Sequence, residues 1–213
     1  MDKTKTASFD VDCQKTFTPI CPDELPVPGG NEIVAELNEQ AKFAAFRLGS
    51  KEGHSLKSIW VKEGKNAQPM KGHKNADAFW VPHAVPGTEG FETLDGLPKP
   101  AAYHYFVWKG VELDMHPYGS CFHDLENKVS TGAIEFLKVN AVETVIVGGL
   151  ALDYCVKETA MQLLAAGFKV ILNLGASLFA VLEINFFKEL LENKNYKIYL
   201  SQVRRLSYCI RWN

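Results

Sequence analysis

The chain has 213 residues, of which 46% are hydrophobic and 23% charged, and its net charge is −2. This length suits one α/β domain with a sizeable core, and the near-neutral charge gives no indication of a nucleic-acid or membrane partner. No apolar run reaches membrane-spanning length, and residues 1–10 lack the apolar segment of a secretory signal. Five widely spaced cysteines without a CxxC motif favour reduced thiols, so we expect a cytoplasmic protein.

Hydrophobic periodicity predicts strands alternating with helices along the chain. We expect strands at residues 6–12, 44–50, 103–109, 144–151, 169–174 and 197–203, and helices at 31–43, 125–140, 153–166 and 182–193. The alternation predicts a six-stranded, mostly parallel sheet in a three-layer αβα arrangement, with residues 1–213 in a single domain and 204–213 as an unassigned tail. Residues 54–100 show little periodicity, and a long irregular segment in a compact domain is usually functional.

Residues 145–160, VIVGGLALDYCVKETA, indicate a buried strand, a tight turn and the start of a helix. We expect Asp153 to cap this helix and Cys155 to lie in its first turn. A helix N-terminus lowers the pKa of a nearby thiol and offers N–H groups to a developing oxyanion. Cys155 is therefore a candidate nucleophile, although a lone cysteine is more often only a small buried apolar residue.

Other reactive side chains follow the preceding predicted strands. Asp12 ends the first strand, Glu52 and His54 follow the second, and Lys109 ends the third. In a parallel sheet the ligand site lies beyond the carboxyl ends of the strands, so these groups should meet Cys155 there. Asp12 could accept the thiol proton, and Lys109 could hold the charged pair.

Four sequence blocks resemble the nicotinamidase and isochorismatase-like cysteine hydrolase family, on its nicotinamidase side. Residues 12–17 (DCQKTF) are similar to D-x-Q-x-x-F, and residues 80–83 (WVPH) with 87–90 (GTEG) are similar to W-P-x-H…G-T-x-G. Lys109 with the following glycine resembles the lysine block. Residues 147–156 (VGGLALDYCV) match V-G-[GI]-x-A-x-D-x-C-V, the most specific of the four. The resemblance runs from about residue 6 to 176 and implies the isochorismatase-like hydrolase fold.

The resemblance also implies a mechanism, in which nicotinamide is converted to nicotinate and ammonia in NAD salvage. Cys155 would attack the carboxamide carbon, Asp12 would carry the proton to ammonia, and Lys109 would stabilise the pair. The backbone N–H groups of Ala151 and Cys155 would form the oxyanion hole, with a cis peptide before Ala151. Water would then hydrolyse the thioester.

A divalent metal ion is a further implication of the resemblance. Glu52, His54 and His83 would hold zinc, iron or manganese near the pyridine nitrogen. Glu52 replaces the usual aspartate and reaches one methylene further. Ser58 stands where a further histidine could stand, and His73 is a weaker substitute from the same loop.

The resemblance places two aromatic rings, those of Phe17 and Trp80, on either side of the pyridine, with Tyr118 in the same wall. Three alternatives stay open. The first is a hydrolase of the same fold acting on another amide, a carbamoyl group or an enol ether. The others are a nicotinamide-sensing protein without turnover and a redox protein pairing Cys155 with Cys13. Assembly as a homo-oligomer also stays open.

Overall fold

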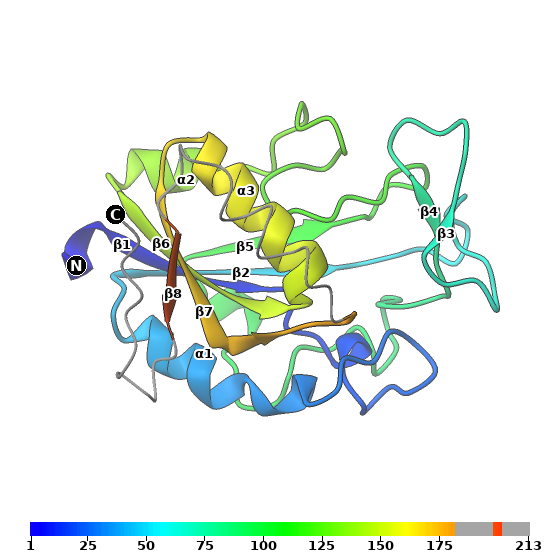
Figure 1. Ribbon diagram of the computed structural model, residues 1–213, viewed down its shortest axis with the longest axis horizontal. Coiled ribbons are helices and arrows are strands. Elements are labelled where there is room, and N and C mark those ends of the chain that lie inside the picture. Colours follow the sequence, from blue (N-terminus) through cyan, green and yellow to red (C-terminus); the bar gives the residue numbers. More distant parts are fainter. Residues whose placement is uncertain (182–197, 202–213) are drawn as a thin grey trace.

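The computed structural model describes residues 1–181 and 198–201. Its main sheet has six strands in the order β5-β2-β1-β6-β7-β8, all of them paired in parallel. The strands are β1 (Thr6–Val11), β2 (Phe46–Glu52), β5 (Tyr105–Lys109), β6 (Thr144–Leu150), β7 (Lys169–Leu178) and β8 (Ile198–Ser201). The predicted six-stranded parallel sheet is confirmed. A small antiparallel pair, β3 (Gln68–Pro69) and β4 (Ala78–Phe79), lies beyond the carboxyl ends of the main strands (Figure 1).

Helices cover both faces of the sheet, as the three-layer prediction requires. Helix α1 (Val34–Ala41) lies on one face, and α2 (Ala133–Val139) and α3 (Lys157–Ala165) lie on the other (Figure 1). The apolar residues of α2 and α3 share one buried cluster with those of β1, β6 and β7, whereas α1 contributes to a second cluster. Short 3-10 turns occur at Lys3–Lys5, Lys15–Phe17, Gly30–Glu32 and Pro100–Ala102.

Two predicted helices are shorter in the structure. The helix expected at 125–140 begins only at Ala133, because Gly132 has a left-handed backbone and Asp124 holds a turn by accepting from the N–H groups of Lys128 and Val129. The first helix is preceded by a 3-10 turn at Gly30–Glu32. The helix expected at 182–193 and the tail at 204–213 lie outside the described residues. No helix in residues 1–181 has the length and hydropathy needed to cross a membrane.

The end of β6 fits closely against β1. Gly149 has a φ of +142°, and a Cβ atom there would overlap the backbone of Val11, its register partner. Shortly after Gly149, the peptide bond between Leu150 and Ala151 is cis, as predicted. A π-helical turn, Leu152–Val156, then leads into α3. This path brings the residues that follow β6 beside those that follow β1.

Candidate active site

Four neighbouring strands deliver the predicted catalytic and metal-binding residues to one end of the sheet. Asp12 follows β1, and Cys155 lies in the turn after β6, the strand next to β1 in the sheet. Glu52 and Lys109 end β2 and β5 and are register partners. All four side chains are buried, and Lys109 and Asp12 are 0% exposed. Three of the four bear charges, so the folded chain must satisfy them by mutual contact.

Lys109 is the centre of these contacts. Its Nζ lies 3.1 Å from Asp12 Oδ2, 2.7 Å from Glu52 Oε1 and 3.7 Å from Cys155 Sγ, and it also donates to Pro117 O at 3.0 Å. Burial alone would lower the pKa of Lys109, but the carboxylates of Asp12 and Glu52 outweigh burial and raise that pKa above its ordinary value. Lys109 is therefore a fixed cation, suited to stabilising anions beside it rather than to moving protons.

Cys155 differs from the expectation drawn from its helix position. Burial raises the pKa of its thiol well above the ordinary value, and the nearby Lys109 offsets this only in part. Its resting form is therefore the protonated thiol. Burial also raises the pKa of Asp12, whose Oδ1 accepts from Ser50 Oγ at 2.7 Å. A raised carboxyl pKa makes Asp12 a better proton acceptor for the thiol.

Asp153 does not cap the helix, so this prediction is wrong. Its carboxylate instead accepts from the backbone N–H groups of Ala180 and Val181, just beyond β7. Ala151 and Cys155 both line the cavity described below, which is compatible with their predicted oxyanion-hole role. That role stays a prediction.

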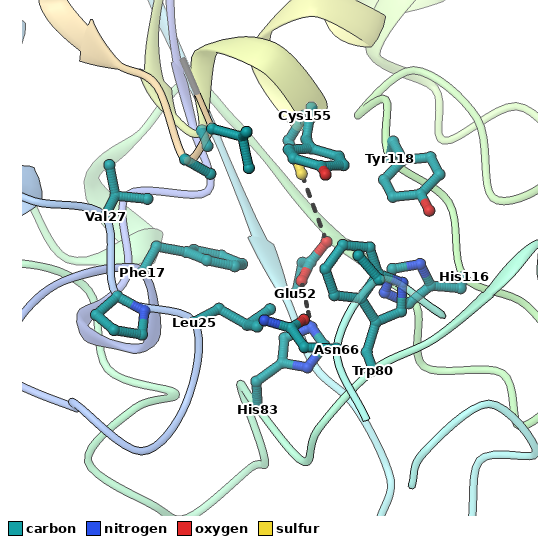
Figure 2. Close-up of a pocket in the computed structure, with 16 residues that line it drawn as sticks. Phe17, Leu25, Val27, Glu52, Asn66, Trp80, His83, His116, Tyr118 and Cys155 are labelled. Carbon is teal, nitrogen blue, oxygen red and sulfur yellow. Dashed lines mark hydrogen bonds and ion pairs between the residues drawn. The ribbon is translucent and has the colours of Figure 1, made fainter. Parts of the chain in front are cut away.

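The three predicted metal ligands form one buried cluster. Glu52 Oε2 lies 2.9 Å from His54 Nε2. The same oxygen lies 3.3 Å from His83 Nε2, and both of these side chains are drawn in Figure 2. The Nδ1 atoms of His54 and His83 lie 2.8 Å from Gly110 O and Val81 O respectively. A carbonyl oxygen only accepts hydrogen bonds, so the Nδ1 atom of each ring must carry a proton. In a neutral imidazole the other nitrogen, Nε2, is then an acceptor, and here it faces the Glu52 carboxylate.

Two acceptors facing each other at such distances call for a cation between them. Burial lowers the pKa of His54, which disfavours a protonated ring as that cation. The positive charge of Lys109 opposes the effect of burial, and the pKa of Glu52 is held well below its usual range, so this carboxylate is an anion. Two ligands bound at about 2.1 Å to one small divalent ion lie roughly 3.0–3.4 Å apart. The donor set and its spacing therefore fit such an ion.

A fourth residue of this cluster was missed by sequence reasoning. His116 contributes a ring nitrogen that lies within 4.8 Å of ligand atoms of Glu52, His54 and His83. The signal in the sequence was a histidine seven residues after Lys109, at the same end of the sheet. Burial lowers the pKa of His116 well below its usual value. His73 is exposed and, among the described residues, stands outside the cluster.

A cavity opens in front of Cys155 and Glu52. Its walls include the three predicted aromatic residues, Phe17, Trp80 and Tyr118. Figure 2 shows Phe17 on one side of the cavity and Trp80 with Tyr118 on the other, with Cys155 and His83 at opposite ends. Tyr154, to which sequence reasoning assigned no role, also lines the cavity, with its ring 5.6 Å from that of Trp80. The cavity has a volume of about 170 Å³.

The fold is a parallel sheet with helices on both faces, and its site gathers a cysteine, an aspartate and a lysine at the carboxyl ends of neighbouring strands. The family model described as the isochorismatase domain matches residues 6–173. The chain belongs to this family. The redox alternative also loses support, because Cys13 lies in the core cluster shared with α1 and its Sγ donates to Val11 O.

Proteins similar to this chain within the family include nicotinamidases and a pyrazinamidase. The chain is 28% identical over 161 residues to a nicotinamidase of Acinetobacter baylyi, covering 74% of this chain and 73% of that protein. Yeast nicotinamidase bound to the inhibitor nicotinaldehyde superposes with a TM-score of 0.78 at 23% identity, covering 91% and 98% of the two chains. The pyrazinamidase of Pyrococcus horikoshii in complex with zinc superposes with a TM-score of 0.66 at 26% identity, covering 93% and 99%. These relatives are amide hydrolases, and the chain is an enzyme of their family.

Proposed function

We propose that this chain is a metal-dependent nicotinamidase, which hydrolyses nicotinamide to nicotinate and ammonia in NAD salvage. The observation that carries the proposal is the placement of Cys155 and Glu52 in one aromatic-walled cavity. An amide carbon at the thiol would put the attached ring between aromatic walls, with its nitrogen toward the histidine cluster. A cavity of about 150 Å³ is known to hold a benzene molecule, so the present one has room for one six-membered ring.

The first half of the reaction acylates Cys155. Asp12 accepts the Sγ proton while the sulfur bonds to the carboxamide carbon, and Lys109 keeps both anions stabilised. The N–H groups of Ala151 and Cys155 stabilise the oxyanion of the tetrahedral intermediate. The C–N bond then breaks, and Asp12 returns the proton to the departing nitrogen. The products are ammonia and a thioester on Cys155.

The second half hydrolyses the thioester. Asp12, again a carboxylate, accepts a proton from water as the water oxygen bonds to the acyl carbon. The C–S bond breaks, and the proton returns to Sγ, so nicotinate leaves and the thiol is restored. One aspartate thus serves as base and acid in both halves, which suits a carboxyl whose pKa burial has raised.

Glu52, His54 and His83 are the residues that would hold the divalent ion. When bound, the ion would supply a Lewis acid that orients and polarises the pyridine ring. The mutual arrangement of the two Nε2 atoms and the carboxylate supports this assignment. The zinc complex of the Pyrococcus relative supports it as well.

Cellular context and partners follow from the same proposal. The four cysteines in the described part of the chain, Cys13, Cys21, Cys121 and Cys155, are free. Free thiols favour a reducing compartment, so we place the enzyme in the cytoplasm. We take residues 1–213 as one catalytic domain whose partner is a small molecule rather than a nucleic acid. A homo-oligomer is compatible with this assignment.

Ammonia release from nicotinamide by the purified protein tests the proposal. The protein is assayed as isolated, after chelator treatment, and after re-addition of zinc, iron or manganese. We expect release to be lost with the chelator and restored by metal. Release that persists in protein shown by elemental analysis to be free of metal would refute metal dependence. If metal-loaded protein releases no ammonia, another amide or carbamoyl compound is the substrate.

A further inference from the structure

We propose that His116 is a third imidazole ligand of the divalent ion, completing a four-residue site with Glu52, His54 and His83. The inference rests on the proposed metal dependence and adds a ligand from the loop after β5. All four side chains are buried, and their ligand atoms lie within 4.8 Å of one another. Figure 2 shows His116 next to Trp80, on the same side of the cavity as Tyr118.

The hydrogen bonding of His116 distinguishes it from a structural core histidine. The side chain is 3% exposed, yet neither Nδ1 nor Nε2 has a hydrogen-bond partner among the described residues. A buried polar group without a partner costs free energy, and buried imidazoles normally have at least one partner. His54 and His83 each use Nδ1 on a backbone carbonyl. A cation at the cluster would give His116 the partner that it lacks.

The backbone on either side of His116 is fixed by three separate hydrogen bonds. Met115 O accepts from Trp60 Nε1 at 3.1 Å, the His116 N–H donates to Asn75 O at 2.7 Å, and Pro117 O accepts from Lys109 Nζ at 3.0 Å. One of these three links comes from the catalytic lysine itself. The imidazole is therefore presented on a segment whose position is set by the active site, as a metal ligand requires.

Two indole rings hold the imidazole plane. The ring of Trp80 stacks on that of His116 with centroids 5.6 Å apart and planes 22° apart. Trp60 meets the same imidazole edge-on, with centroids 4.4 Å apart. Because two indole rings pack against the imidazole, its rotation is restricted while one of its nitrogens lies within 4.8 Å of the other ligand atoms. Pre-organisation of this kind lowers the entropy cost of ion binding.

His116 also accounts for a departure in the sequence. Ser58 stands where a further histidine could supply an imidazole, and His73, the other candidate, is exposed. His116 supplies that imidazole from a different loop. Four protein ligands would close a tetrahedral shell, whereas a catalytic ion keeps an open position. An ion held by these four residues would therefore take part in substrate binding only if it kept a further position for water or for the ring nitrogen of the substrate.

X-ray absorption of the zinc-loaded wild-type enzyme counts imidazole ligands directly. We expect three imidazoles and one carboxylate at the ion. Two imidazoles would overturn the proposal while leaving the metal-dependent function intact. A wild-type protein that binds no zinc would overturn both. This measurement needs no variant, so it does not depend on a variant folding.

Variants provide a second readout, in competition with a chromogenic chelator for zinc. His116→Ala and His116→Gln should each raise the zinc dissociation constant at least about 10-fold, since even groups behind the ligands contribute about 10- to 100-fold. His73→Ala is the matched control and should leave the constant unchanged. The visible absorption of bound Co²⁺ should change in the His116 variants, because its bands depend on coordination number.

One alternative outcome separates a metal ligand from a substrate contact. If the His116 variants keep wild-type zinc affinity and Co²⁺ absorption but have a raised KM for nicotinamide, His116 contacts the ring of the substrate, and the proposal is wrong. Circular dichroism of each variant confirms that the comparison is made between folded proteins. His116→Gln keeps a polar side chain of similar size and is the safer variant for folding.

Discussion

Glu52 and Lys109 are register partners on β2 and β5, and Glu52 Oε1 lies 2.7 Å from Lys109 Nζ. The second oxygen of the same carboxylate, Oε2, faces His54 and His83. A single side chain thus connects Lys109, which lies beside Cys155, to the histidine cluster. The extra methylene of glutamate allows this span. A change in charge at the cluster is therefore felt at Lys109 and also at Cys155, whose Sγ donates to the same Glu52 Oε1 at 3.7 Å.

Substitution of Glu52 should separate the two tasks of this carboxylate. Glu52→Gln removes the charge, so we expect zinc affinity and kcat each to fall at least about 100-fold. Glu52→Asp keeps the charge but cannot reach Lys109 and the histidines together. We expect it to keep zinc affinity within about 10-fold of wild type, with a larger loss in kcat. Zinc titration and ammonia-release kinetics on both variants check this, and equal kcat in Glu52→Asp and wild type would refute the spanning role.

Cys155→Ala should abolish turnover and leave the fold intact. Loss of a nucleophile typically lowers kcat by about 10⁴-fold or more. The thiol is buried beside two carboxylates, so its removal should not lower the thermal unfolding midpoint. Ammonia release and a thermal melt are the measurements. Cys121→Ala, which removes another buried thiol, is the control and should retain activity.

The pH profile should report Asp12. A protonated Asp12 cannot accept the thiol proton, so kcat/KM should fall as the pH drops through its pKa. Because burial raises that pKa, this fall should occur at a higher pH than for an ordinary carboxyl. Ser50 donates to Asp12 and lowers its pKa. Ser50→Ala should therefore move the acid limb of the profile to higher pH.

The control for this profile is Ser8→Ala. Ser8 is also a buried strand serine, but its Oγ has no hydrogen-bond partner among the described residues. The acid limb of the kcat/KM profile of Ser8→Ala should coincide with that of the wild type. An acid limb that does not move in Ser50→Ala would mean that a group other than Asp12 controls it.

Trp80 should contribute to substrate binding through its ring. It lines the cavity opposite Phe17 and contacts the rings of His116 and Tyr154. Trp80→Ala removes a wall, and we expect KM for nicotinamide to rise about 10-fold, whereas Trp80→Phe keeps a ring and should stay within about 3-fold. Steady-state kinetics give both values, and identical KM values for the two variants would exclude a stacking role.

Gly149 should be intolerant of a side chain. A Cβ atom there would overlap the carbonyl of Val11, and the φ of +142° is unfavourable for other residues. We expect Gly149→Ala to lower the free energy of unfolding by about 3 kcal/mol or more. Gly167→Ala is the control, because Gly167 also has a positive φ but no atom within 4 Å of the new Cβ. Urea unfolding should show a cost of about 1 kcal/mol there.

The sequence was most informative where strand and motif coincide. Asp12, Lys109 and Cys155 each end or follow a predicted strand, so a parallel sheet alone predicts that they meet. The helix at 125–140 was overestimated because its apolar spacing continues through Gly132 into a turn held by Asp124. Hydrophobic periodicity gives no information about side chains that hydrogen-bond to nearby backbone groups. Here the hydrogen bonds of Asp124 to the backbone help to determine where the helix begins.

The pKa of Cys155 and the place of His116 could not be predicted in the same way. A helix terminus favours thiolate, but complete burial among Glu52 and Asp12 outweighs it, and burial at a loop junction depends on the whole fold. His116 lies on an irregular segment whose path is set by contacts with Trp60, Asn75 and Lys109. Such long-range contacts leave no periodic trace in a single sequence.

The order of the strands determines which parts of the chain must come together before the active site is complete. Three of the site residues come from the first 109 residues of the chain: Asp12 follows β1, and Glu52 and Lys109 end β2 and β5. Cys155 follows β6, which lies on the other side of β1 in the sheet. A fragment ending after β5 would hold the base and the cation without a thiol, and a fragment starting at β6 would hold the thiol without them. Neither half could attack an amide alone. Ammonia release from two separately produced halves would therefore report that they had docked along the β1–β6 seam.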